Sequence, residues 1–176
     1  MKLVMALLGA TLVSTSAMAA GYFEKKSGDL SNDGLNPTPV KVKIGSSTID
    51  GDDGNGANGV DRDYFTIKVP QGAVLASIIL DPHTRIGGNF SFIGVQKGKQ
   101  VTVDPNGGDP SALLGWMHFS TADEGTDLLP QICQGAGAKG CTPPLGPGNY
   151  SFWVQELSTC DCHYRFIFNV TAKTDD

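Results

Sequence analysis

Short runs of alternating apolar and polar residues, separated by Gly and Pro, constrain the fold of this chain most strongly. In residues 64–69, Phe65, Ile67 and Val69 alternate with polar residues. Successive side chains of a β-strand point to opposite faces, so this period of two is typical of a strand with one buried face. Similar alternation recurs in 150–154 and 164–170. No amphipathic run reaches the roughly ten residues of a typical helix, and the chain is predicted to be all-β.

The expected strands follow from these runs and from the turn residues between them. They are 40–44, 64–69, 74–80, 90–95, 100–103, 113–119, 149–156 and 164–170. The last two are predicted to form a closing antiparallel hairpin. About eight strands suit a two-sheet antiparallel sandwich of jelly-roll type.

The N-terminus is predicted to be a signal peptide at residues 1–19. Lys2 precedes an apolar run over 3–13, and Ala17-Met18-Ala19 is a small-x-small cleavage site. The apolar run is too short to span a bilayer, and no later segment has the length of a transmembrane helix. We expect an exported protein, secreted or periplasmic, with a polar lead-in at 20–36 and a single β domain at 37–176.

The charge of the chain argues against two classes of partner. The formal net charge is -5, and removal of Lys2 with the signal peptide makes it -6. No stripe of Lys and Arg is present, whereas nucleic acids and anionic membranes both favour clustered basic residues. Neither is therefore expected as a partner.

The four cysteines are expected to form disulfides, because their number is even and the chain is predicted to be exported. Cys133 and Cys141 precede the strand at 149–156, and Cys160 and Cys162 follow it. An extended strand of that length separates the two pairs by roughly 25 Å. Cys133–Cys141 is therefore the favoured bridge, and Cys160 and Cys162 either pair locally or stay reduced. A soft-metal site that includes His163 is the alternative for the second pair.

The segment 50–63 concentrates Asp, Asn and Gly just before the strand at 64–69. We expect it to be a loop that gathers carboxylate and amide oxygens, the ligands that calcium prefers. It lacks the bidentate Glu of an EF-hand loop. Two interpretations remain, a calcium site and a solvated Asp/Asn/Gly turn.

A family resemblance bears on this choice. The acidic lead-in, the Val/Ile strand, Asp61-Arg62-Asp63-Tyr64-Phe65 and Val69-Pro70-Gln71-Gly72 together resemble the bacterial pre-peptidase C-terminal domain. The resemblance covers 27–172 and implies a secreted β-sandwich with a calcium ion; some members of that family bind collagen or polysaccharide. Gly28 and Leu30 depart from the family pattern, which has a Glu-x-Glu there. The ligands that the resemblance implies are Asp29, Asn32, Asp33, Asp61 and Asp63.

Trp153 is the candidate for an aromatic ligand platform, because it alternates out of phase with Phe152 and Val154. Core packing is the alternative, since aromatic residues on strands usually pack inside. The three histidines are far apart in sequence, and no Gly-x-Ser-x-Gly or His-Glu-x-x-His motif is present. A non-enzymatic protein is therefore predicted, with a small hydrolase as a weaker alternative.

These features together predict a secreted binding module, stabilised by calcium, for an extracellular glycan or matrix protein. The alternative is a structural subunit of an extracellular matrix or filament. Such a subunit would self-associate through exposed sheet edges that accept a neighbour's strand, with a disordered lead-in at 20–36 as the donated strand.

Overall fold

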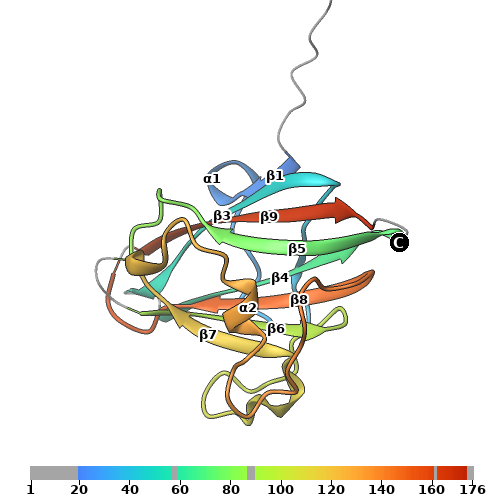
Figure 1. The fold of residues 1–176 in the computed structure, drawn as a ribbon. Helices are drawn as coiled ribbons and strands as arrows, with labels where there is room; N and C mark the ends of the chain where they lie inside the picture. The colour runs from blue at the N-terminus through green and yellow to red at the C-terminus, as the bar shows by residue number, and fades with distance from the viewer. Residues whose placement is uncertain (1–19, 57–58, 87–89, 161, 174–176) are drawn as a thin grey trace, which may run out of the picture.

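The protein folds mostly as β-strands, which form an antiparallel sheet curled into a half-barrel (Figure 1). The computed structural model describes residues 20–56, 59–86, 90–160 and 162–173; the predicted signal peptide lies outside them. The strands are β1 (Ala20–Phe23), β2 (Thr38–Pro39), β3 (Gly45–Gly56), β4 (Gly59–Val69), β5 (Ala73–Leu80), β6 (Ser91–Lys97), β7 (Gly115–Phe119), β8 (Gly148–Gln155) and β9 (Cys162–Ala172). The helical elements are α1 (Glu24–Ser27), η1 (Pro110–Ala112), η2 (Thr121–Asp123) and α2 (Leu129–Ile132). None of these helices has the length and apolar character that crossing a bilayer requires.

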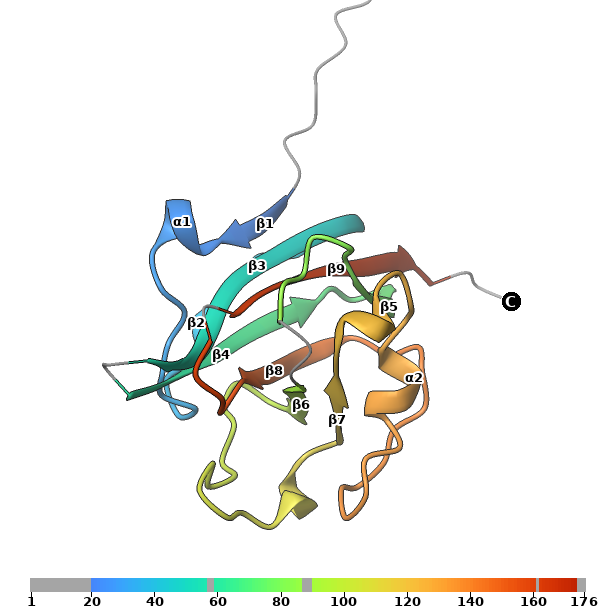
Figure 2. The same ribbon diagram turned by 90° about the vertical axis from the view of Figure 1, so that its left-hand side faces the viewer.

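The strand order is β5-β9-β3-β4-β8-β6-β7, with β1 added in parallel to β3 and β2 in parallel to β4. The middle of this order is weakly joined, because β3 pairs with β4 only between Gly54–Gly56 and Gly59–Asp61. Elsewhere β3 pairs with β9 and β4 pairs with β8. The sheet therefore curls about the β3–β4 junction (Figure 2). The predicted all-β class is confirmed, whereas an arrangement in two separate packed sheets is not.

The core lies inside the curl and is rich in phenylalanine. Phe65 of β4 stacks on Phe152 of β8 with ring centroids 5.1 Å apart, and Phe168 of β9 meets Phe152 edge-on at the same distance. All three side chains are fully buried, and each contributes roughly 1.5–3 kcal/mol by leaving water. The predicted alternation in these three strands is confirmed.

Two predicted strands are wrong. Residues 40–44 are not a strand; β2 ends at Pro39, and only the Val40 N–H continues its bonding, to the Thr66 carbonyl at 2.8 Å. Residues 100–103 are not a strand either. There the Thr102 N–H donates to the Gln96 side chain at 3.0 Å and Val101 bonds to the lead-in, so no continuous ladder forms.

The predicted closing hairpin is also wrong. β8 lies between β4 and β6, and β9 lies between β3 and β5. Neighbouring strands in the sequence pair often but not always, and here each of the two joins a different half of the curl. The lead-in is not disordered: it forms β1, α1 and further ordered backbone that packs on the sheet.

Both predicted cysteine pairs are at disulfide distance. The Cα atoms of Cys133 and Cys141 are 4.7 Å apart, and those of Cys160 and Cys162 are 5.2 Å apart. The first bridge closes the loop after α2, and the second lies at the start of β9.

Candidate functional site

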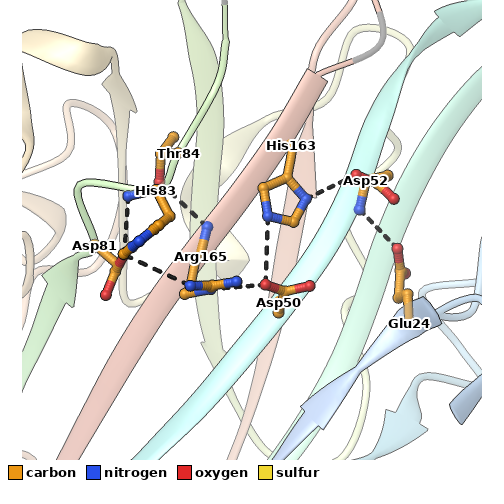
Figure 3. Close-up of polar contacts among 8 residues, drawn as sticks. All are labelled: Glu24, Asp50, Asp52, Asp81, His83, Thr84, His163 and Arg165. Atoms are coloured by element: carbon orange, nitrogen blue, oxygen red, sulfur yellow. Dashed lines mark hydrogen bonds and ion pairs between the residues drawn. The ribbon is translucent and has the colours of Figure 1, made fainter. Parts of the chain in front are cut away.

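The acidic segment predicted as a loop is mostly strand, and its partner β9 explains why. On the outer face of the sheet, the Arg165 guanidinium donates to Asp50 at 2.7 Å. The His163 ring lies 2.7 Å from Asp52 and 3.3 Å from Asp50 (Figure 3). Asp and Gly have low strand propensity, but these cross-strand contacts match Asp50 and Asp52 with basic partners. Tertiary pairing therefore overrides local preference in β3.

The inner face of the same strands carries carboxylates into the end of the core. Asp63 continues the inward column of Phe65, and its Oδ2 accepts a hydrogen bond of 2.7 Å from the buried Tyr164 hydroxyl. Gly51 permits this contact, because a Cβ there would lie 2.5 Å from the Tyr164 hydroxyl and 3.0 Å from Asp63 Oδ2. Asp53 lies two residues further along β3 and is also buried.

The lead-in closes this end of the sheet. Leu30 is 2 % exposed and joins the main core. Glu24 of α1 accepts two backbone hydrogen bonds. One comes from Leu30 N–H at 2.9 Å, and the other comes from Asp52 N–H at 2.6 Å (Figure 3). These bonds hold the Glu24 carboxylate over the junction between the lead-in and β3.

Glu24, Asp29 and Asp63 form a compact set of carboxylates, which we call the acidic cluster. One oxygen from each lies within 4.8 Å of the others. Calcium–oxygen distances are about 2.3–2.6 Å, so ligands of one calcium ion can have such separations. Two members come from the lead-in and one from β4. A cation held here would tie the N-terminal segment to the sheet.

Burial makes the ionised form of these groups costly. It raises the pKa of Glu24 and that of the neighbouring Asp53 to about 7, with surrounding carboxylates adding to the shift. The pKa of Asp63 is raised well above its usual range, first by burial and then by the charge of Glu24. The carboxylates therefore repel one another and lack the water that would otherwise solvate them.

Several carboxylate oxygens here have no partner. Both oxygens of Asp53, Oδ1 of Asp61 and Oδ1 of Asp63 are buried without a hydrogen-bond donor among the described residues. Buried polar groups are almost always satisfied in native proteins, because each unsatisfied one costs roughly 1–3 kcal/mol, and more if charged. These unpartnered oxygens all belong to acidic side chains and could accept a proton or contact a cation.

A cleft of about 610 Å³ opens beside the cluster. Its acidic lining includes Asp29, Asp53 and Asp61, together with Asn32. Asp29 is exposed, so the cluster has one solvent-facing side.

The residues that the family resemblance implied divide into three groups. Asp29 and Asp63 lie together in the acidic cluster. Asp61 and Asn32 line the adjacent cleft, where the charge of Asp29 helps burial to raise the pKa of Asp61. Asn32 Oδ1 accepts the Arg62 N–H at 2.7 Å.

Asp33 lies apart from the cluster. Its two oxygens accept hydrogen bonds from Leu35 N–H at 2.8 Å and from the Asn36 amide at 2.6 Å within its own turn. These bonds lower the pKa of Asp33, with the Asn36 bond as the largest cause. Asp33 therefore stabilises the turn.

Sequence analysis did not single out Glu24 or Asp53. The family pattern places Glu at positions occupied here by Gly28 and Leu30, and α1 supplies Glu24 from four residues before Gly28 instead. Asp53 was expected in a solvated loop. A signal for it was present: Ser47, Ile49, Gly51 and Asp53 share one face once β3 is extended.

Trp153, the predicted ligand platform, is 5 % exposed. It lies on the opposite face of β8 from Phe152, as the alternation predicted, and packs in a second cluster outside the main core. Its ring stacks with Tyr64 at 5.9 Å and tilts against Phe92 at 4.6 Å. Trp153 thus belongs to a packed aromatic layer on the outer face of the sheet.

Two of the three histidines lie beside carboxylates, and the third, His118, contacts the rings of Phe92 and Trp116. His83 contacts Asp81 at 2.5 Å, and His163 lies between Asp50 and Asp52. In the described part of the chain, no hydrogen bond joins either ring to a Ser, Thr or Cys side chain.

Comparison of the chain with models of protein families, with curated proteins and with solved structures finds no match. Functional inference therefore depends on the geometry of this chain itself.

Proposed function

We propose that this protein is a calcium-stabilised, non-enzymatic binding module that acts outside the cytoplasm of a bacterium and takes a glycan or matrix protein as its ligand. The observation that carries the proposal is the acidic cluster with unpartnered, buried carboxylate oxygens around it. Calcium is a hard cation with six to eight oxygen ligands in flexible geometry, which suits a set made only of oxygen donors.

Calcium would act here as a structural clamp. Glu24 and Asp29 reach the cluster from the lead-in, and Asp63 reaches it from β4. Two positive charges would offset the repulsion among the three carboxylates and supply the partner that Asp63 Oδ1 lacks. The clamp would hold β1 and α1 on the sheet edge formed by β3.

Two further features support an extracytoplasmic location. The predicted signal peptide would direct export, and two disulfides are compatible with an oxidising compartment.

A non-enzymatic role is favoured because the ring contacts of His83 and His163 are carboxylates. Nucleophilic hydrolysis needs a base within hydrogen-bond reach of a nucleophile. A small hydrolase remains the weaker alternative, and release of product from a bound ligand would reveal it.

One observation favours the second candidate function, a structural subunit. β1 lies on the outer edge of β3 in parallel pairing of only four residues. Exchange of so short a strand between copies would build polymers. Size-exclusion chromatography over a range of concentrations separates the two: concentration-dependent polymers favour the subunit, and a monomer favours the binding module.

The calcium proposal is tested by thermal unfolding of residues 20–176 in chelator and in excess calcium. At a calcium concentration of about 100 times Kd, stabilisation is about 2.7 kcal/mol. This corresponds to a Tm rise of roughly 5–10 °C in a domain of this size. Asp63→Asn should abolish the rise, and Asp109→Asn, in an exposed turn where Asp109 accepts only from Ser111, should retain it. An unchanged Tm on calcium addition would overturn the proposal.

A further inference from the structure

Both tryptophans of the chain line one pocket on the outer face of β6, β7 and β8. The pocket has a volume of about 380 Å³, within the range of small-ligand sites. Trp116 and His118 come from β7, Phe92 from β6 and Trp153 from β8. The loop before η1 forms the rim with Asp104 and Pro105, and Pro110 of η1 adds to it.

Strand register explains why a hollow forms here. Gly94 of β6 lies in register with Trp116 on one side and with Trp153 on the other. Gly94 has no side chain, so the Phe92 ring lies over it; a Cβ at Gly94 would come within 3.0 Å of that ring. The result is a row of rings in which Phe92 sits between the two indoles.

The row offers aromatic faces at close spacing. Phe92 and Trp116 are stacked, with centroids 5.9 Å apart and ring planes 26° apart. Phe92 and Trp153 are 4.6 Å apart. Phe92 and Trp116 are only partly buried and His118 is exposed, so the pocket is open to solvent. Flat aromatic faces of this kind bind rings that carry C–H groups on one side.

The pocket also has polar groups that suit hydroxyls. The tryptophan N–H groups are not among them. The Trp153 side chain is 5 % exposed and its indole N–H is buried without an acceptor among the described residues, and the Trp116 indole donates to the Ala136 carbonyl at 2.9 Å. Asp104 supplies a carboxylate, of which Oδ1 accepts the Asn106 N–H at 2.9 Å. The His118 imidazole can donate or accept.

We propose that this pocket is a binding site for a neutral sugar ring of a glycan, with Phe92 and Trp116 stacking on the ring and Asp104 and His118 bonding its hydroxyls. The inference rests on the proposed function of a non-enzymatic binding module and names the ligand class and its place. Hydroxyls donate and accept, so one sugar ring can donate to the Asp104 carboxylate and bond the His118 imidazole in either tautomer.

Other ligand classes fit less well. An anionic polysaccharide or a nucleic acid would meet the Asp104 carboxylate and a chain of net charge -5. A polyproline segment would stack on the rings, but proline has no N–H to donate to Asp104. The observations therefore favour a neutral glycan over either.

The two indoles allow a direct test, because they are the only tryptophans in the chain and both line the pocket. Intrinsic fluorescence of residues 20–176, in calcium, is titrated with neutral gluco-, manno-, galacto-, xylo- and N-acetylglucosamine oligosaccharides. A proline-rich peptide and an anionic polysaccharide are titrated in parallel. We expect a saturable shift in emission with at least one neutral oligosaccharide.

Variants locate the site. Trp116→Ala should weaken binding by about tenfold or more, as loss of a central aromatic contact does. Phe92→Leu keeps an apolar side chain and should weaken sugar binding to a smaller extent. It serves as a second variant in case Trp116→Ala fails to fold. Phe90→Ala is the matched control, because Phe90 is 68 % exposed and does not line the pocket. Sugar binding to Trp116→Ala is measured by titration calorimetry, because this variant has lost one of the two fluorescent indoles.

The inference is overturned if no neutral oligosaccharide gives a saturable response. It is also overturned if only the peptide or the anionic polymer binds, or if Trp116→Ala binds as the wild type does. Calcium-dependent Tm measured on the same sample separates the two proposals. A calcium shift without sugar binding removes only the sugar site, and sugar binding without a calcium shift removes only the clamp. Cleavage of the bound sugar would make the protein an enzyme and leave the site in place.

Discussion

The acidic cluster and the aromatic face of β6–β8 differ in how well the polar groups buried there are compensated. At the β3–β4 end, Glu24, Asp29 and Asp63 crowd like charges together, and several carboxylate oxygens lack a donor. On the outer face of β6–β8, the aromatic rings pack against one another. Among the described residues, the Trp153 indole N–H is the only buried side-chain donor there without an acceptor. We propose that a bound cation stabilises the first region, whereas the second is stabilised by the packing of its own rings. Calcium dependence of stability should therefore be confined to the acidic end.

The largest expected effect comes from detaching the lead-in from the core. Leu30→Ala should destabilise the protein by about 2–5 kcal/mol, the cost of truncating a buried leucine. It should also weaken calcium binding, because Glu24 and Asp29 are carried by the same segment. Thermal unfolding and calcium titration measure both. Leu35→Ala, at a 51 % exposed position of the same segment, is the control. Calcium affinity that survives Leu30→Ala would show that the cluster does not depend on the docked lead-in.

The next effect is a pH dependence specific to the calcium-free protein. The folded-state pKa of Glu24 and that of Asp53 are raised to about 7, above the values of about 4 in an unfolded chain. Between those limits the folded protein binds more protons than the unfolded one, so stability falls as pH rises and levels off above about 7. A shift from about 4 to about 7 in one group corresponds to roughly 4 kcal/mol. Solvent screening of the partly exposed Glu24 reduces its share, and we expect a loss of a few kcal/mol across this window.

Unfolding midpoints in chelator from about pH 3.5 to about pH 8, which span the window of about 4 to 7, check this expectation. Calcium should remove the slope by competing with protons, and Asp53→Asn should reduce it. A flat profile in chelator would mean that the cluster tolerates its own charge, and the contrast between the two regions would lose its basis.

A smaller effect is expected at the aromatic face. Trp153→Phe removes the unpartnered N–H and keeps a ring, so the gain from losing a buried donor and the loss of packing should nearly cancel, within about 1 kcal/mol. The Tm rise with calcium should be the same as in the wild type, since sites without shared partners contribute additively. A reduced calcium response in this variant would show that the two regions are coupled through Tyr64 and Asp63.

The smallest effect is expected at Asp33. Asp33→Asn keeps acceptors for the turn and lies outside the acidic cluster, so both stability and calcium response should stay close to the wild type. A lost calcium response would place Asp33 among the ligands, as the family resemblance implied.

Sequence patterns predicted the strands whose alternation is complete, such as β4 and β8, because a half-buried strand imposes a period of two on its own residues. They did not predict β3, where Asp and Gly hide the period until Arg165 and His163 of β9 compensate the charges. Pairing partners were also beyond local patterns, as the wrong β8–β9 hairpin shows. For the candidate site, the family resemblance named Asp29 and Asp63, which the structure brings together in the acidic cluster. Glu24 was missed because its position depends on how α1 folds back, which spacing alone does not encode.

The pairing of β3 with β9 has a consequence for how the chain reaches its native state. Asp50 and Arg165 are 115 positions apart. The residues of β3 are therefore synthesised long before those of β9, the strand with which β3 pairs. Folding rates fall as such distant contacts accumulate, and nascent strands with bare edges aggregate. A high density of negative charge and of glycine disfavours aggregation of a strand that is not yet paired. The composition that obscures β3 in the sequence therefore protects it during biosynthesis.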